Sequence, residues 1–240
     1  MISIKRSISL ILLAVFTGLA GCGQVEQAER IGTPPSEKNT AKQDAAAQKK
    51  ERTRTILFFG NSLTAGYGLE PDQAFPALIQ QRIDSLGLPY KVINAGVSGE
   101  TTAGGNSRID WLLKQPVDIF VLELGANDGL RGINVTESYQ NLQSIIRKVR
   151  AKYPEVKIVL AGMQIPPNMG RKYAQEFRNI YTRLEKEENV TLIPFLLDKV
   201  AGIPKLNQAD GIHPTIEGQK IVATNVWEII APLVTSDEKA

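Results

Sequence analysis

The sequence from residue 54 to residue 235 predicts one α/β domain built on a parallel sheet. Short apolar runs alternate there with amphipathic helical patterns, and neither an internal repeat nor a second shift in composition divides the segment. The middle runs are almost continuously apolar, as expected for strands that helices cover on both faces. Such alternation is typical of parallel strands connected by helices on both sides of the sheet.

Each expected element follows from its pattern of apolar residues. Strands are expected at the short runs 55–59, 90–94, 117–124, 156–162 and 190–195. Helices are expected where apolar residues recur three and four positions apart, because that spacing places them on one helical face. These patterns cover residues 75–86, 139–149, 173–184 and 221–230.

Residues 1–21 are interpreted as a lipoprotein signal peptide. Lys5 and Arg6 precede an apolar stretch at 8–20, which at about 1.5 Å per residue cannot cross a hydrocarbon core of about 30 Å. A basic start followed by a short apolar stretch is typical of an export signal. The stretch ends in Leu-Ala-Gly-Cys, which resembles a bacterial lipobox, so Cys22 is expected to be lipidated and to begin the mature chain.

Residues 22–53 are predicted to be a flexible tether. From residue 23 to residue 53 there is no aromatic side chain, and Val25 and Ile31 are the only large aliphatic ones. Such a stretch buries too little apolar area to offset the entropy of ordering it. We therefore expect an exported bacterial lipoprotein, anchored in a membrane through Cys22 and located in the periplasm or at the cell surface.

Composition argues against several classes of protein. The formal net charge of +3 is too small to indicate a nucleic-acid partner. One histidine and one cysteine leave few ligands for a metal hydrolase. No phosphate-binding glycine motif follows the first expected strand, which argues against a nucleotide-binding module. We expect the chain to need no cofactor. A monomer is the expected form, although the sequence itself does not determine the oligomeric state.

Three glycine-rich polar loops follow the first three expected strands, at 60–62, 94–102 and 124–129. In open parallel sheets, ligands bind beyond the carboxyl ends of the strands. The three loops therefore indicate a site at one edge of the predicted sheet.

Ser62, at the end of the first expected strand, is a candidate nucleophile. A serine hydroxyl needs a base to take its proton, and His213 is the only histidine in the chain. Asp210 lies three residues before His213, where it can accept the Nδ1 proton and leave Nε2 for the serine. Taken alone, a single loop histidine is more often a surface or capping residue. Ser98, in Gly-Val-Ser-Gly-Glu, is a rival nucleophile in an incomplete Gly-x-Ser-x-Gly motif.

Acyl transfer also needs hydrogen-bond donors for the oxyanion. The candidates are the backbone N–H groups of Ser62 and Gly99 and the side-chain amide of Asn127. Gly99 is suited to a positive φ. Taken alone, a glycine or an Asn-Asp-Gly sequence is equally typical of an ordinary turn.

Four sequence blocks together resemble the SGNH (GDSL) hydrolase family. They are FFGNSLTAGYGL at 58–69, NAGVSGETT at 94–102, LGANDGLRG at 124–132 and DGIHP at 210–214, in the order that the family has them. The resemblance covers about residues 55–232 and is greatest to the bacterial arylesterase and thioesterase/lysophospholipase group. The segment MQIPPNMGRKYAQEF at 163–177 also resembles that group.

The resemblance implies a fold and a role for each matching residue. The fold is a flavodoxin-like, three-layer α/β/α sandwich with a five-stranded parallel sheet. Ser62 is implied to be the nucleophile, His213 the base and then the acid, and Asp210 the residue that orients it. The implied oxyanion hole is formed by Ser62, Gly99 and Asn127, and the implied substrate-contacting loop holds Asp128, Leu130 and Ile133.

Asn61 departs from the family, which has aspartate between the glycine and the serine of its first block. The implied triad acid lies in the Asp-x-x-His block, which is intact here. Because asparagine keeps an acceptor and adds donors, we expect it still to brace the loop.

The expected activity is hydrolysis of carboxylic esters or thioesters by a serine esterase of the arylesterase, thioesterase or lysophospholipase type. A carbohydrate O-deacetylase of the same fold and a catalytically inactive surface binding protein are the alternatives. The sequence leaves the acyl group and the leaving group open.

Overall fold

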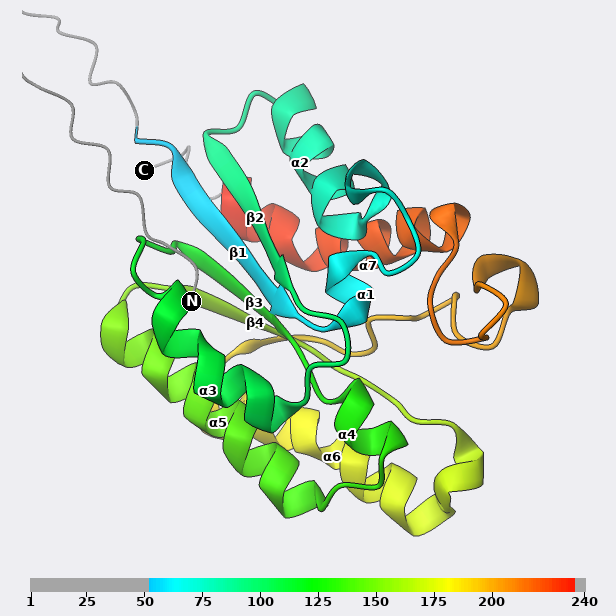
Figure 1. The fold of residues 1–240 in the computed structure, drawn as a ribbon. Coiled ribbons are helices and arrows are strands. Elements are labelled where there is room, and N and C mark those ends of the chain that lie inside the picture. Colours follow the sequence, from blue (N-terminus) through cyan, green and yellow to red (C-terminus); the bar gives the residue numbers. More distant parts are fainter. Residues whose placement is uncertain (1–51, 236–240) are drawn as a thin grey trace, which may run out of the picture. The chain divides into compact units, whose positions relative to one another are not determined.

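The structure, a computed structural model, describes residues 52–235 (Figure 1). The expected signal peptide, Cys22 and all but the last two residues of the expected tether lie outside the described residues. In the described part, no helix is long and apolar enough to cross a membrane.

The domain is built on one parallel sheet with the strand order β2-β1-β3-β4-β5, which confirms the expected five strands (Figure 1). The strands are β1 Arg54–Gly60, β2 Tyr90–Gly96, β3 Ile119–Glu123, β4 Lys157–Ala161 and β5 Thr191–Ile193. β5 is shorter than expected because Pro194, which has no N–H to donate, follows it directly. The chain passes from β1 to β2 on one side of β1, and then crosses to β3 on its other side. A topological switch point therefore lies beside β1.

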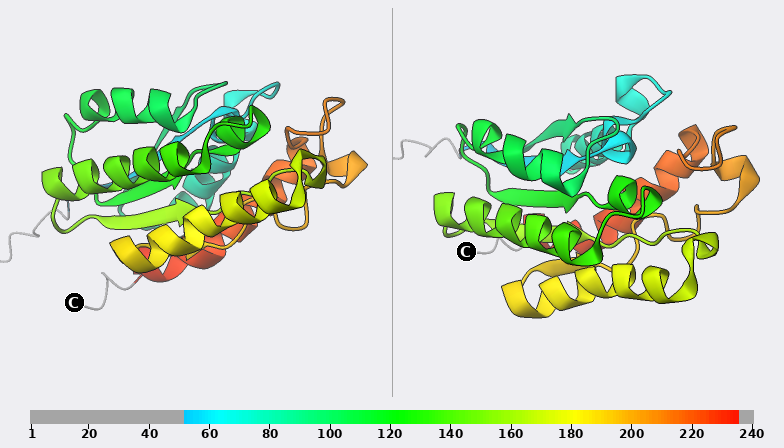
Figure 2. Two further views of the ribbon diagram at one scale, coloured as in Figure 1. Left: turned by 90° about the horizontal axis from the view of Figure 1, so that it is seen from below. Right: turned by 60° about the horizontal axis from the view of Figure 1, so that its bottom comes forward.

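Helices cover both faces of the sheet, so the expected three-layer α/β/α sandwich is confirmed. α2 packs against α7 on one face, while α3, α5 and α6 lie side by side on the other (Figure 2). The helices are α1 Ser62–Ala65, α2 Phe75–Ser85, α3 Thr102–Leu112, α4 Ala126–Leu130, α5 Val135–Lys152, α6 Arg171–Glu188 and α7 Ile216–Thr235. Short 3-10 turns lie at Pro71–Gln73, Pro167–Met169 and Pro204–Leu206.

The core lies between the sheet and its two helical layers. Every side chain of β3 is buried, and the rings of Phe58 on β1 and Phe75 on α2 meet edge to face at 5.5 Å. Packing of this kind holds the carboxyl ends of β1 and β3 in register, at the edge where the candidate loops emerge.

Helix α3 was missed by the sequence analysis, because its buried face contains few large apolar residues. Its segment includes adjacent glycines, Gly104 and Gly105, which weaken a helical pattern. Gly105 is buried, and a Cβ added there would lie 2.4 Å from Leu124 Cδ1 and 3.1 Å from a ring carbon of Phe59. The close approach of α3 to the sheet therefore depends on this glycine.

The Gly105→Ala change is expected to lower the free energy of unfolding by about 1–3 kcal/mol, because the added methyl overpacks the contact with Leu124. Gly104→Ala is the matched control in the same helix, since its added Cβ would come no nearer than 3.3 Å to any other atom, at the flexible Glu100 side chain, and would lie 3.7 Å from Thr101 Oγ1. Urea denaturation measures both variants. Equal midpoints for the two variants would contradict the packing argument.

Candidate active site

Ser62 lies at the carboxyl end of the sheet, as the first residue of the short helix α1. The preceding residue, Asn61, is the N-cap of that helix, and its Oδ1 accepts a hydrogen bond from the Leu63 N–H at 2.9 Å. This capping bond fixes the turn from β1 into α1. Ser62 is consequently held on a sharp strand-to-helix turn.

His213 brings the three candidate triad residues together. Its Nε2 lies 2.8 Å from Ser62 Oγ, and its Nδ1 lies 2.6 Å from Asp210 Oδ2. The chain's only histidine therefore contacts Ser62. Ser98, the rival nucleophile, lies in an exposed turn. The arrangement is that of a nucleophile, a base and an orienting acid.

Asp210 is held in its ionised form. Its Oδ1 accepts hydrogen bonds from the backbone N–H groups of Ile212 at 2.9 Å and His213 at 3.0 Å. Burial of the carboxyl opposes ionisation, but the hydrogen bonds from the His213 side chain and from these backbone groups outweigh it and lower the Asp210 pKa from 3.8 to about 2. An ionised Asp210 keeps the imidazole proton on Nδ1, so Nε2 is free to accept the Ser62 proton.

Tyr67 and Gln208 support the histidine, and the sequence analysis assigned no role to either. The Tyr67 ring lies 4.6 Å from the His213 ring, centre to centre. Gln208 donates from Nε2 to the carbonyl oxygens of Tyr67 at 2.7 Å and Pro214 at 3.0 Å. Its backbone N–H donates to the His213 carbonyl at 2.7 Å. The loop that carries the histidine is thus bonded to the segment that follows the serine.

Two further oxyanion-donor candidates lie on the neighbouring loops. Gly99 has a φ of +81°, in agreement with the expected positive φ, and the only atom near an added Cβ would be an Arg131 nitrogen at 3.9 Å. Backbone conformation, rather than lack of space, is therefore what favours glycine there. Asn127 lies in α4, and its Nδ2 donates to the Glu100 carbonyl at 3.0 Å. An amide nitrogen carries two protons, so this bond leaves one for a ligand.

The side chain of Asp128 is buried, so the expectation that it contacts substrate is wrong. Its side chain is 1% exposed. Oδ2 accepts from the Thr102 N–H at 2.9 Å, and Oδ1 accepts from Thr102 Oγ1 at 2.6 Å and Ser138 Oγ at 3.3 Å. The carboxylate therefore ties α4 to the starts of α3 and α5.

Leu130 and Ile133, the other two residues expected to contact substrate, differ in what they face. Leu130 is partly exposed and lines an apolar cavity of about 470 Å³. Ile133 is half-buried, and its carbonyl accepts a hydrogen bond from the Tyr173 hydroxyl at 2.7 Å, which fastens the loop to α6. Leu130 is thus the member of the expected set that faces a cavity.

The apolar cavity reaches the residues next to the candidate catalytic groups. Ile212, which precedes His213, and Ala126, which precedes Asn127, both line it. Ile165, Phe195 and Leu197 form further parts of its wall. The cavity is well suited to an apolar group attached to a carbonyl at Ser62.

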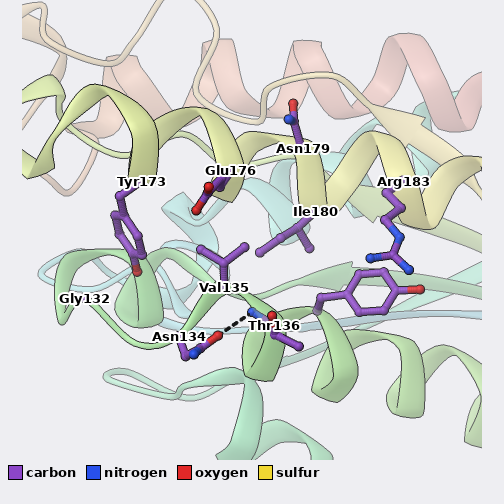
Figure 3. Close-up of a pocket in the computed structure, with 10 residues that line it drawn as sticks. Gly132, Asn134, Val135, Thr136, Tyr173, Glu176, Asn179, Ile180 and Arg183 are labelled. Carbon is purple, nitrogen blue, oxygen red and sulfur yellow. Dashed lines mark hydrogen bonds between the residues drawn. The ribbon is translucent and has the colours of Figure 1, made fainter.

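A second cavity of about 650 Å³ lies between α5 and α6 (Figure 3). Its lining includes Glu176 and Arg183, and it contains none of the candidate triad residues. Figure 3 shows Tyr173 pointing from α6 toward the loop at Gly132, and Asn134 bonded to the N–H of Thr136. The loop thus borders both cavities, through Leu130 on one side and Gly132 on the other.

Comparison with known proteins agrees with this geometry. The profile of the GDSL-like Lipase/Acylhydrolase family matches residues 58–221. Esterase TesA of Pseudomonas aeruginosa is 41% identical over 193 residues, which cover 80% of this chain and 92% of that protein. Thioesterase 1/protease 1/lysophospholipase L1 of Escherichia coli strain K12 is 39% identical over 184 residues, covering 76% of this chain and 86% of that protein. The crystal structure of TesA superposes with a TM-score of 0.72 at 41% identity, over 75% of this chain and 99% of that one.

Proposed function

Because the chain belongs to the GDSL-like Lipase/Acylhydrolase family and is a carboxylic ester hydrolase, we propose that it cleaves its substrates through an acyl-enzyme on Ser62. The observation that carries the proposal is the continuous hydrogen-bonded row of Ser62, His213 and Asp210, with contacts of 2.8 Å and 2.6 Å. Such a row is what a serine hydroxyl needs in order to act as a nucleophile at neutral pH.

Acylation begins when Ser62 Oγ attacks the carbonyl carbon of the substrate and its proton passes to His213 Nε2. The negative charge then moves to the carbonyl oxygen, where the Ser62 N–H, the Gly99 N–H and the free proton of the Asn127 amide are the donors. The first N–H groups of a helix have no intrahelical partner, which supports the part given to the Ser62 N–H at the start of α1. Losing one such donor typically costs about 2.7–4 kcal/mol of transition-state stabilisation.

Collapse of the tetrahedral species breaks the bond to the leaving oxygen or sulfur, which takes the proton from His213 Nε2. Water then attacks the acyl carbon and gives a proton to His213, and Ser62 recovers its hydroxyl proton as the acid departs. Throughout, the ionised Asp210 stabilises the positively charged imidazole without taking its proton.

The natural substrates are proposed to be lipid-like esters or thioesters with an extended acyl chain. The apolar cavity beside Ile212 supports this, and so do exposed apolar side chains around the triad: Tyr67 is 52% exposed, Ile212 44% and Leu130 37%. An acetyl group attached to a sugar would leave most of this apolar wall without a contact.

The enzyme is further proposed to be a lipoprotein with a signal peptide at 1–21, a lipidated Cys22, a tether at 22–53 and a hydrolase domain at 54–235. The support is the lipobox-like sequence and the apolar-poor segment that follows it. The anchor would hold the domain close to lipid substrates.

Removal of the nucleophile tests the mechanism. We expect Ser62→Ala to lower kcat/KM for p-nitrophenyl butyrate by at least about 10³-fold and to abolish labelling by a fluorophosphonate, because the acyl-enzyme has no other acceptor. Ser98→Ala is the matched control and should retain both the hydrolysis of p-nitrophenyl butyrate and the labelling by the fluorophosphonate. Full activity in Ser62→Ala would rule out the proposed nucleophile.

The length of the acyl chain tests the substrate class. Across p-nitrophenyl esters from acetate to decanoate, kcat/KM should rise by up to about fourfold for each methylene buried, since each is worth about 0.8 kcal/mol. Leu130→Ala should weaken the gain with chain length, whereas Ile216→Ala, an exposed residue outside the cavity wall, should not. Activity confined to acetate would favour a deacetylase instead.

Cell fractionation tests the anchor. Expressed in a bacterium with its own signal, the wild-type chain should sediment with membranes, and Cys22→Ala should not, because it lacks the thiol that is lipidated. A Cys22→Ala chain that still sediments with membranes would contradict the lipid anchor.

A further inference from the structure

Glu123 is a buried carboxyl directly beneath the turn that carries Ser62. It is the last residue of β3 and has no exposed surface. Oε2 accepts from the Asn61 N–H at 3.0 Å and from Thr64 Oγ1 at 2.7 Å, and Oε1 accepts from Asn61 Nδ2 at 2.8 Å. All of these donors therefore belong to the turn and to helix α1.

Asn61 connects this carboxyl to the nucleophile. Its Nδ2 faces Glu123, while its Oδ1 caps α1 at Leu63 and lies 3.5 Å from Ser62 Oγ. Little space is left between strand and carboxyl, because a Cβ added at Gly60 would lie 2.5 Å from Glu123 Oε2. A change in the bonding of Glu123 must therefore reach the position of Ser62.

The hydrogen-bond pattern fits the ionised form of Glu123. An ionised carboxylate only accepts hydrogen bonds, and the backbone and side-chain nitrogens of Asn61 only donate them. A proton on Oε1 would face the Asn61 amide, donor against donor. A proton on Oε2 is tolerated only if the Thr64 hydroxyl turns round to accept it. Protonation on Oε1 thus breaks the bond to Asn61 Nδ2, whereas protonation on Oε2 reverses the bond to Thr64 Oγ1 and removes the charge that strengthens the bond from the Asn61 N–H.

We propose that Glu123 is a positioning residue whose ionised carboxylate holds the Asn61–Ser62 turn in the geometry that places Ser62 Oγ against His213, and whose protonation releases it. The proposal rests on the proposed function, because it concerns the reactivity of the same serine. Asn61 gives this chain its particular behaviour. An aspartate there, as the description GDSL-like implies for the family, would place a second carboxyl against Glu123, and the two would share one proton.

The surroundings of Glu123 place its titration in the neutral range. Burial raises its pKa from 4.5 to about 7, against the opposing hydrogen bonds from Thr64 and Asn61. Among residues 52–235, no lysine, arginine or histidine forms an ion pair with it. From the α6 side the titratable group that faces it is the buried Tyr181, whose hydroxyl donates to the Leu124 carbonyl at 2.9 Å.

The pH profile of kcat/KM on the mature chain with p-nitrophenyl butyrate tests the proposal. The active form must lack two protons, one on the His213 base and one on Glu123, so the limiting slope of log kcat/KM at low pH should be about two. Asn61→Asp should fall with a slope of about one. Between pH 7 and pH 5 it should lose about 50-fold less activity than the wild type, because the shared proton removes the neutral-range titration of a carboxyl whose pKa is about 7.

Three further variants make the test specific. Thr64→Val removes a donor to the carboxylate, so the inflection that belongs to Glu123 should move to higher pH. Glu123→Gln should give a slope of about one at reduced activity. Glu188→Gln is the control, since it removes another buried carboxylate, one that pairs with Arg147 and Arg150 just before β5, at the opposite edge of the sheet. It should keep the wild-type slope even if the fold is weakened.

Stability should change in the opposite direction over the same pH range. Between pH 4.5 and 7 the folded chain holds a proton on Glu123 that the unfolded chain has lost, so the free energy of unfolding falls as pH rises through this range. The urea midpoint of the wild type should therefore fall from pH 4.5 to pH 7 by more than that of Glu123→Gln. The fall in the urea midpoint shows that Glu123 titrates in this range, and the slope of log kcat/KM shows whether that titration controls activity.

The outcomes separate the two proposals. A wild-type slope of one, with normal fluorophosphonate labelling of Ser62, overturns the role of Glu123 and leaves the proposed function intact. An unshifted inflection in Thr64→Val, or a slope of two in Asn61→Asp, also overturns it. No turnover and no labelling of Ser62 at any pH would overturn both proposals.

Discussion

The hydrogen bond of 2.8 Å between Ser62 Oγ and His213 Nε2 joins the first strand of the sheet to the loop before the last helix. No local pattern brings these segments together. Their meeting depends on a parallel sheet, in which the carboxyl ends of all strands lie along one edge. The apolar β1 and β3, buried between two helical layers, hold that edge in place. Gln208 then bonds the histidine loop to Tyr67, so the contact does not depend on the two side chains alone.

The sheet and the Asp210–His213 pair could be predicted from local patterns, and the pairing of His213 with Ser62 from the single histidine in the chain and from the four blocks that resemble the family. Strands covered on both faces appear as apolar runs, and Asp210 and His213 lie three residues apart. Helix α3 could not be predicted, because its close approach to the sheet depends on Gly105. A glycine has no side chain and adds nothing to an apolar pattern in the sequence. Asp128 was misplaced because adjacent helical residues point about 100° apart, so a position beside Asn127 does not imply a shared direction.

Glu123 shows a different limit of sequence reasoning. In the sequence it is one acidic residue at the end of an apolar run, and its donors come from a turn about 60 residues earlier, Asn61 among them. Its burial costs free energy that the fold recovers only in part through hydrogen bonds. Buried carboxyl groups whose surroundings disfavour the ionised form are common at functional sites. Here the less stable, ionised form is the one whose bonds hold the nucleophile.

The two cavities differ in what they offer a substrate. The apolar one reaches Ile212, next to His213. The one between α5 and α6 is lined mostly by charged and polar side chains, with Val135 and Ile180 among them. The loop from Leu130 to Ile133 borders both and is fastened by the Tyr173 hydroxyl. Under the proposed function, a fastened loop of this kind gives the acyl chain a wall of fixed shape.

The central claim is that Ser62 carries the acyl group. Mass spectrometry of the purified enzyme, mixed with p-nitrophenyl butyrate and quenched in acid within the first turnover, tests it most directly. We expect a butyryl group on the peptide that contains Ser62, and none in His213→Ala, which lacks the base. A butyryl group on Ser98, or rapid turnover with no acylated peptide at all, would contradict the account.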